Sequence, residues 1–164
     1  VGTAAIQIAS LLGARVIVTA GSEEKLAKAK TLGADFGINY NTSDFVKEVM
    51  DITEGAGVGL VIDTVGGSVF EDSLRAMGKG GRLVTCGTTA EPKCQINVQN
   101  LFAMRKSLLG SFMGSKGELL EAMKYIHNGK LKPVVHATFP LEQAREAHTV
   151  MAERSNFGKI VLTI

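Results

Sequence analysis

The chain has 164 residues, of which 45% are hydrophobic and 21% charged, and its formal net charge is +2. This length and balance are those of an ordinary globular protein, so we expect residues 1–164 to form one domain. The small charge and the absence of a basic run argue against a nucleic-acid partner, and the apolar stretches are too short to cross a membrane.

The cysteine content favours a reducing compartment. Cys86 and Cys94 cannot make a disulfide framework, and no Cys/His cluster has the spacing of a structural zinc site. No basic region or processing site marks the start as a secretory leader, so we expect a cytoplasmic protein. Because Val1 is not Met, we also expect the natural chain to begin further upstream.

The first segment is predicted to be a helix that begins at Gly2 and ends at Gly13. A glycine followed by small side chains at a helix N-terminus lets backbone N–H groups reach a diphosphate, which the helix dipole favours. The segment is similar to the second half of a Gly-x-Gly-x-x-Gly dinucleotide loop, with the preceding strand and first glycines missing. A plain turn before an amphipathic helix remains the alternative.

Strand-like and helix-like segments alternate along the rest of the chain. The predicted strands are 14–20, 36–40, 58–64, 82–86, 107–113, 134–139 and 158–164. The predicted further helices are 22–33 (capped by Ser22 and Gly33), 44–53, 68–77, 98–105, 118–128 and 141–154. This alternation predicts an α/β fold with a doubly wound parallel sheet covered on both faces, and the apolar run 58–64 predicts a buried strand.

One strand of such a sheet is missing. The strand that precedes the glycine loop lies at the centre of a doubly wound sheet. Without it, the strands at 14–20 and 58–64 each lose a neighbour and leave backbone groups unpaired. We therefore expect either a longer chain or another element in that position.

Glycine and small polar residues follow several predicted strands, at the edge where open parallel sheets bind ligands. These strand ends are Ala20-Gly21-Ser22, Tyr40-Asn41, Thr64-Val65-Gly66-Gly67 and Cys86-Gly87-Thr88. Glycines at several such ends indicate that the backbone must approach a ligand closely.

The end of strand 14–20 is the most informative. An NAD site usually carries an acid there to hold the ribose hydroxyls. This chain has Gly21-Ser22 instead, with Lys25 one turn into the helix, which supplies a hydroxyl and a charge for a 2′-phosphate. Tyr40 could lie against the adenine or donate to the same phosphate. A plain N-cap for Ser22 and a solvated helix face for Lys25 are the alternatives, and we favour the phosphate interpretation.

No proton-transfer pair or nucleophile stands out. Asp63 ends a strand and is more typical of a turn or helix cap than of a catalytic acid. His127, His136 and His148 lie on unrelated elements, so we expect no metal site or catalytic triad in this chain. The chemistry would come from a cofactor or from residues outside this chain.

Taken together, these residues resemble the medium-chain dehydrogenase/reductase superfamily, most closely its zinc-independent quinone oxidoreductase branch, which is related to zeta-crystallin. Gln7 and Ser10 match the end of the branch signature, in which Gly is followed by four residues, Gln, two residues and Lys, Arg or Ser. The other matching stretches are Thr19-Ala20-Gly21-Ser22, Leu32-Gly33-Ala34 with Asn39-Tyr40, Asp63-Thr64-Val65-Gly66-Gly67, and Gly158-Lys159-Ile160-Val161-Leu162.

The resemblance implies a Rossmann-type NADP(H)-binding domain of strand order 3-2-1-4-5-6 that lacks its first strand and the family's N-terminal GroES-like domain. It places Gly2 and Thr3 at the diphosphate, with Gly21, Ser22, Lys25 and Tyr40 around the adenosine 2′-phosphate. Val65 would lie near the ribose or adenine, and Gly87, Thr88, Phe112 and Met113 near the nicotinamide, with Asn156 and Phe157 closing over it. In similar proteins the strand around 107–113 pairs across a dimer.

The resemblance further implies hydride transfer from NADPH to a small quinone or conjugated carbonyl substrate. The alternatives are a cofactor domain of a zinc-dependent alcohol dehydrogenase and a non-enzymatic nucleotide-binding or redox-sensing module. Substrate contacts and any zinc ligands would lie mainly in the absent domain, so we expect this chain alone to bind NADPH weakly and to have no turnover.

Overall fold

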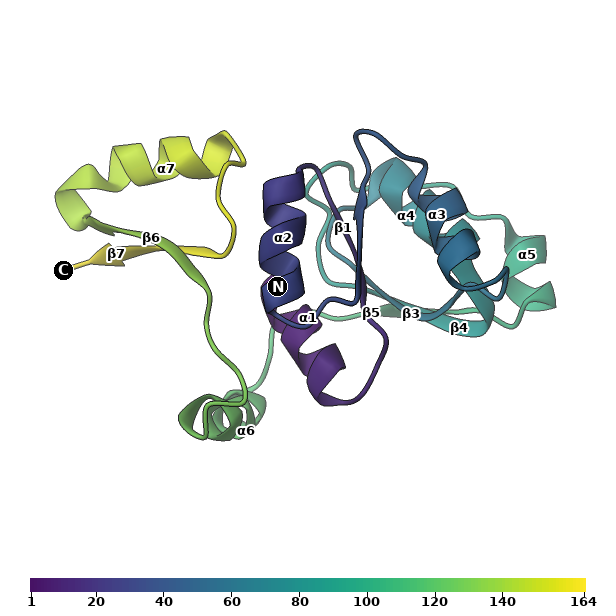
Figure 1. The fold of residues 1–164 in the computed structure, drawn as a ribbon, viewed down its shortest axis with the longest axis horizontal. Coiled ribbons are helices and arrows are strands. Elements are labelled where there is room, and N and C mark those ends of the chain that lie inside the picture. The colour runs from purple at the N-terminus through teal and green to yellow at the C-terminus, as the bar shows by residue number, and fades with distance from the viewer. The chain divides into compact units, whose positions relative to one another are not determined.

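The computed structural model describes all residues 1–164 and divides into two compact units (Figure 1). We call residues 38–116, with Val1, the central unit, and residues 2–37 and 117–164 the terminal unit. Each unit has its own secondary structure and its own packed residues. That the two units act as one domain remains a prediction.

The central unit is built on a three-stranded parallel sheet in the order β3-β4-β5. Its strands are β3 (Val58–Asp63), β4 (Met77–Thr85) and β5 (Ser107–Gly110). Its helices are α3 (Phe45–Ile52), α4 (Gly67–Ala76) and α5 (Val98–Ala103). Helix α4 connects β3 to β4 and packs on both of them, and α3 packs on α4.

Only one face of this sheet is packed. Val61, Leu83 and Leu108 stand in register on that face, and Phe70 and Met77 pack with them around the fully buried Leu83. The opposite face carries exposed apolar side chains. Leu60 is 55% exposed, Ile62 44% and Leu109 47%.

Within the central unit, the predicted burial of strand 58–64 therefore holds on the face of Val61 and Asp63 but not on the face of Leu60 and Ile62. Successive residues of a strand point to opposite faces, and α4 covers only the face that carries Val61.

Two strand boundaries also differ from prediction. Strand β4 begins at Met77, directly after α4, and not at residue 82 as predicted. Val58 pairs with Met77 but Leu60 pairs with Arg82, and this shift in register accommodates residues 78–81 within β4. An added Cβ at Gly78 would lie 2.3 Å from the Ala56 carbonyl oxygen, so the close approach of β4 to the chain that precedes β3 requires glycine there. Strand β5 ends at Gly110, which leaves Phe112 and Met113 outside it.

The terminal unit begins with α1 (Gly2–Leu11), β1 (Ile17–Ala20) and α2 (Glu23–Thr31). Strand β2 (Phe36–Asn39) follows, forms a two-stranded sheet with β1, and runs across the boundary between the units. Ile6 of α1 packs with Val16, Ala29 and Ala34, so the small side chains of these segments allow close packing. Residue 33 must be glycine, because its φ is +105° and an added Cβ would lie 2.5 Å from Ser10 Oγ.

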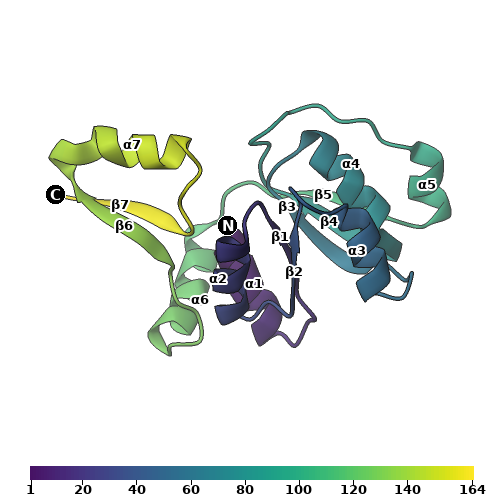
Figure 2. The same ribbon diagram turned by 45° about the horizontal axis from the view of Figure 1, so that its top comes forward.

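The C-terminal part of the terminal unit contains a parallel strand–helix–strand arrangement, visible in Figures 1 and 2. Its elements are α6 (Lys116–His127), β6 (Val135–Pro140), the 3-10 turn η1 (Leu141–Gln143), α7 (Ala144–Ala152) and β7 (Lys159–Thr163). Helix α7 packs on both strands. None of the helices has the length and apolar character needed to cross a bilayer.

The strand pairing agrees with the predicted Rossmann-type order. Within the predicted order 3-2-1-4-5-6, the neighbours that the structure shows are the pair β1-β2 and the sheet β3-β4-β5. In the structure, β1 pairs with β2 and β3 pairs with β4, while β1 and β3 belong to separate sheets. The α/β class and the parallel pairing are thus confirmed.

We predict that Gly66→Ala destabilises the protein by at least about 2 kcal/mol, because L-residues are strained at this backbone conformation. Gly66 has φ 78° and ψ −167°, and an added Cβ would lie 2.4 Å from the Glu91 carbonyl oxygen. Urea denaturation measures the change. Gly59→Ala is the matched control, since an added Cβ there meets nothing within 4 Å. Equal unfolding midpoints for the two variants would contradict the prediction.

Candidate functional site

The turn between β1 and α2 carries the residues that the sequence assigns to a 2′-phosphate. Ser22 is the N-cap of α2, with an extended backbone, and its Oγ accepts a hydrogen bond from the Lys25 N–H at 3.3 Å. The N-cap interpretation of Ser22 is confirmed. It does not exclude the phosphate interpretation, because a hydroxyl that accepts one hydrogen bond still has a proton to donate.

Lys25 is half-buried, and its side chain has a specific partner. Its Nζ donates to the carbonyl oxygen of Arg154, 129 residues away, at 2.5 Å. Arg154 has a φ of +54°, in the left-handed region. Lys25 is therefore not a freely solvated lysine. An ammonium carries three protons, so this contact leaves two further donors on Nζ.

The segment after Arg154 contains the predicted closing residues. Asn156 donates from Nδ2 to the Gly158 carbonyl oxygen at 3.0 Å. Phe157 packs against the cluster formed by Ile6, Val16, Ala29 and Ala34. The structure thus brings 154–158 onto the α2 side of the terminal unit.

Acidic side chains also lie in the first turn of α2, at Glu23 and Glu24. Glu24 forms an ion pair with Lys28 one turn further along the helix, with 2.6 Å between Oε1 and Nζ. The Lys28 ammonium holds the pKa of the Glu24 carboxyl below its usual value. This pairing directs the Glu24 carboxylate toward Lys28 and away from the N-terminal end of the helix.

The N-terminus of α1 offers a second position for an anion. Its first turn contains no acidic residue, and Gly2 is exposed, with open space where a Cβ would stand. Thr3 is half-buried, and its carbonyl oxygen accepts a hydrogen bond from Gln7 Nε2 at 3.1 Å. Exposed N–H groups at the start of a helix without a carboxylate suit a phosphate group.

In the central unit, the parallel strands bring Val65, Gly87 and Thr88 to one edge of the sheet. The chain after β4 runs beside the chain after β3. Backbone bonds join Cys86 N–H to the Asp63 carbonyl oxygen at 3.1 Å and Ala90 N–H to the Val65 carbonyl oxygen at 2.9 Å. An added Cβ at Gly87 would lie 3.4 Å from the Thr64 carbonyl oxygen. The two turns therefore lie side by side at one sheet edge, where Gly66 and Gly67 are buried, Val65 and Gly87 are half-buried and Thr88 is exposed.

Asp63 holds this edge in place. Asp63 is 4% exposed, and its carboxylate accepts hydrogen bonds from the Val65 N–H at 3.3 Å and from the Gly66 N–H at 3.2 Å. Thr85 Oγ1 on the neighbouring strand lies 3.4 Å from it. The expectation that Asp63 is a turn residue is confirmed, since its oxygens stabilise the turn that leads into α4.

The remaining predicted site residues of the central unit are exposed. Tyr40 follows β2 and is 54% exposed, while Phe112 and Met113 follow β5 and are 93% and 83% exposed. Ser111 N–H donates to the Thr85 carbonyl oxygen at 2.9 Å, which anchors the chain just before Phe112. A common site formed by these residues with Ser22 and Lys25 remains a prediction.

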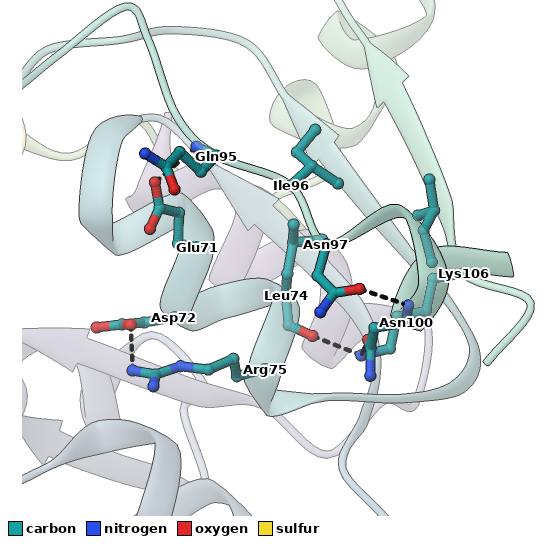
Figure 3. Close-up of a pocket in the computed structure, with 10 residues that line it drawn as sticks. Glu71, Asp72, Leu74, Arg75, Gln95, Ile96, Asn97, Asn100 and Lys106 are labelled. Atoms are coloured by element: carbon teal, nitrogen blue, oxygen red, sulfur yellow. Dashed lines mark hydrogen bonds and ion pairs between the residues drawn. The ribbon is translucent and has the colours of Figure 1, made fainter. Parts of the chain in front are cut away.

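The central unit also has a hollow outside the predicted site, of about 680 Å³, between α4, α5 and residues 95–97 (Figure 3). Its polar groups bind one another. Lys106 Nζ donates to the Leu74 carbonyl oxygen at 2.6 Å and to Asn100 Oδ1 at 3.0 Å, and burial lowers the pKa of the Lys106 ammonium. Arg75 pairs with Asp72, and Glu71 Oε1 accepts from the Gln95 N–H at 2.7 Å.

Two contacts were missed from the sequence. No sequence motif links Arg154 to Lys25, because Arg154 accepts the Lys25 hydrogen bond through its main-chain carbonyl oxygen. Gln7 was noted only as part of a signature, yet its side chain binds both main-chain groups of Lys132. Such long-range bonds to the backbone leave no pattern in the sequence of side chains.

With this geometry in hand, comparison with known proteins identifies the family. Residues 1–128 match the family model described as "Zinc-binding dehydrogenase". The chain is 30% identical to quinone oxidoreductase-like protein 2 of Bos taurus over 99% of this chain and 50% of that protein. It is 35% identical to a 2-haloacrylate reductase of Burkholderia sp over 92% of this chain and 48% of that protein.

Solved structures agree with these relatives. The crystal structure of an NAD-dependent alcohol dehydrogenase is 45% identical and superposes with a TM-score of 0.92 over 99% of this chain and 47% of that one. The chain thus spans about half the length of the proteins it matches. The predicted superfamily is confirmed, and the chain belongs to the zinc-binding dehydrogenase family of medium-chain dehydrogenases/reductases.

Proposed function

We propose that the full-length protein is an NADPH-dependent oxidoreductase that transfers hydride to a quinone or conjugated carbonyl compound, and that this chain binds the NADP(H). The observation that carries the proposal is the presence of both a hydroxyl, that of Ser22, and an ammonium, that of Lys25, at the N-terminal end of α2. An NAD site usually has a carboxylate at this strand end, which would repel a 2′-phosphate.

The residues present fit such a cofactor. The α1 N-terminus has open N–H groups and no acid for the diphosphate, and Ser22 and Lys25 retain donors for the 2′-phosphate. The Val65 and Gly87 turns lie side by side at a sheet edge and carry small residues, which suits the close approach of a ribose and a nicotinamide. In this proposal Gly2, Thr3, Gly21, Tyr40, Thr88, Phe112, Met113, Asn156 and Phe157 also contact the cofactor.

When bound, the nicotinamide would supply the hydride, and the role of this chain would be to bind and orient it. The relatives support the acceptor class. One is named a quinone oxidoreductase-like protein and another a 2-haloacrylate reductase, whose named substrate contains a C=C bond conjugated to a carboxyl group. We infer that the acceptor is a small electron-poor molecule of this kind.

The cofactor preference is tested by two substitutions in the full-length protein. Lys25→Ala should weaken NADPH binding about tenfold, because one charge-assisted hydrogen bond is lost, with NADH binding little changed. Ser22→Asp should weaken NADPH at least as much while keeping the helix cap, since Asp is also a good N-cap. Isothermal titration measures both, with the exposed Lys30→Ala as control. Tighter binding of NADH than NADPH by the wild type would refute the proposal.

A zinc-dependent alcohol dehydrogenase is the second candidate. It is favoured by the description of the matching family and by the NAD-dependent alcohol dehydrogenase at 45% identity. In this chain, no group of three or more His, Cys, Asp and Glu side chains is arranged to hold a metal ion, so catalytic zinc ligands would come from elsewhere in the protein.

Metal analysis separates the two candidates. Our proposal predicts no tightly held zinc in the full-length protein and oxidation of NADPH by quinones or enals that survives treatment with a chelator. About one zinc ion per chain, with chelation abolishing activity, would favour the alcohol dehydrogenase. Absence of NADPH oxidation across a broad acceptor panel would instead favour a non-enzymatic nucleotide-binding module.

We further propose that the full-length protein is a homodimer that pairs along β5. This strand is the last in the order β3-β4-β5, and the exposed Phe112 and Met113 follow it. An unpaired strand edge flanked by apolar side chains is suited to strand addition by a second copy. Sedimentation should show a dimer for the wild type and a shift toward monomer for Phe112→Asp. Met151→Asp, on α7, should remain dimeric, and a monomeric wild type would contradict the proposal.

A further inference from the structure

The side-chain amide of Gln7 joins two segments that are distant in the sequence. Gln7 Nε2 donates to the Lys132 carbonyl oxygen at 3.0 Å, and Gln7 Oε1 accepts from the Lys132 N–H at 2.9 Å. The same Nε2 donates to the Thr3 carbonyl oxygen at 3.1 Å. One amide thus binds the first turn of α1 and both main-chain groups of a residue 125 positions away.

Lys132 lies in the connection between α6 and β6, which has no regular secondary structure. On its N-terminal side, the Leu131 N–H bonds back to Tyr125 in α6, and on its C-terminal side the Val134 carbonyl oxygen accepts from Lys159 N–H. Pro133 between them has no N–H to donate. Gln7 therefore anchors the middle of this connection.

The Thr3 contact links this anchor to the proposed diphosphate position. The Thr3 carbonyl and the Ala4 N–H belong to the same peptide unit, and that N–H lies in the first turn of α1, where such groups have no partner within the helix. An anion that accepts a hydrogen bond from this unit polarises it and strengthens its carbonyl as an acceptor. The polarisation would pass through the Gln7 amide, from Nε2 to Oε1, to the Lys132 N–H.

We propose that Gln7 is a positioning residue that couples diphosphate binding at α1 to the order of the α6–β6 connection. This inference rests on the proposed function, because it requires a dinucleotide at the N-terminus of α1. It goes beyond that function by assigning a coupling role to a side chain that does not itself contact the cofactor. Since NADPH and NADH share the diphosphate, the coupling does not discriminate between them.

Hydrogen exchange of the Lys132 amide in the full-length protein tests the coupling. In the wild type, saturating NADPH or NADH should slow exchange of this amide. Gln7→Met keeps the side-chain length and removes the amide. In the absence of cofactor, the Gln7→Met substitution should speed exchange of the Lys132 amide hydrogen by about tenfold or less, as expected for the loss of one hydrogen bond. It should also abolish the response to both cofactors and weaken their binding by a similar factor. Gln143→Met, at an exposed glutamine, is the matched control.

The outcomes distinguish this inference from the proposed function. If the wild type binds NADPH but Lys132 exchange does not respond, or if Gln7→Met responds as the wild type does, the inference is overturned and the cofactor proposal stands. A merely structural Gln7 would lower the thermal stability and leave the response to cofactor intact. If titration shows no dinucleotide binding to the wild type, the proposed function and this inference fail together.

Discussion

Parallel pairing of strands is the constraint on which the candidate site depends. When strands run parallel, their carboxyl ends meet at one edge, and the turns that follow them become neighbours. In the central unit this places the chain after β3 beside the chain after β4, and the buried Asp63 carboxylate holds the first turn in shape. Small residues stand at these strand ends, and the proposed function uses this edge as the binding surface.

The β1–α2 turn adds a chemical preference to this arrangement. Ser22 is fixed by its role as the cap of α2, and Lys25 by its bond to the Arg154 carbonyl oxygen. Both groups are therefore held in place before any ligand arrives, which lowers the entropy that binding must overcome. The hydrogen bond between Lys25 and Arg154 also connects α2 to the chain just before Asn156 and Phe157. In the proposed function, these preorganised donors would favour a phosphorylated ribose.

Sequence reasoning succeeded where local chemistry decides the structure. Ser22 caps its helix as predicted, and the alternation of strands and helices gives the observed order. It failed where packing decides. The start of β4 at Met77 depends on close approach to the chain at Ala56, and the exposure of Leu60 and Ile62 depends on which face α4 covers. The Arg154 and Lys132 contacts use main-chain atoms, which every residue possesses.

A crystal structure of the full-length protein with bound NADPH tests the central claim most directly. The account predicts that the 2′-phosphate accepts hydrogen bonds from Ser22 Oγ and Lys25 Nζ, and that no carboxylate lies in contact with it. A carboxylate such as that of Glu23 beside the adenosine ribose, or a 2′-phosphate bound away from the β1–α2 turn, would contradict the account.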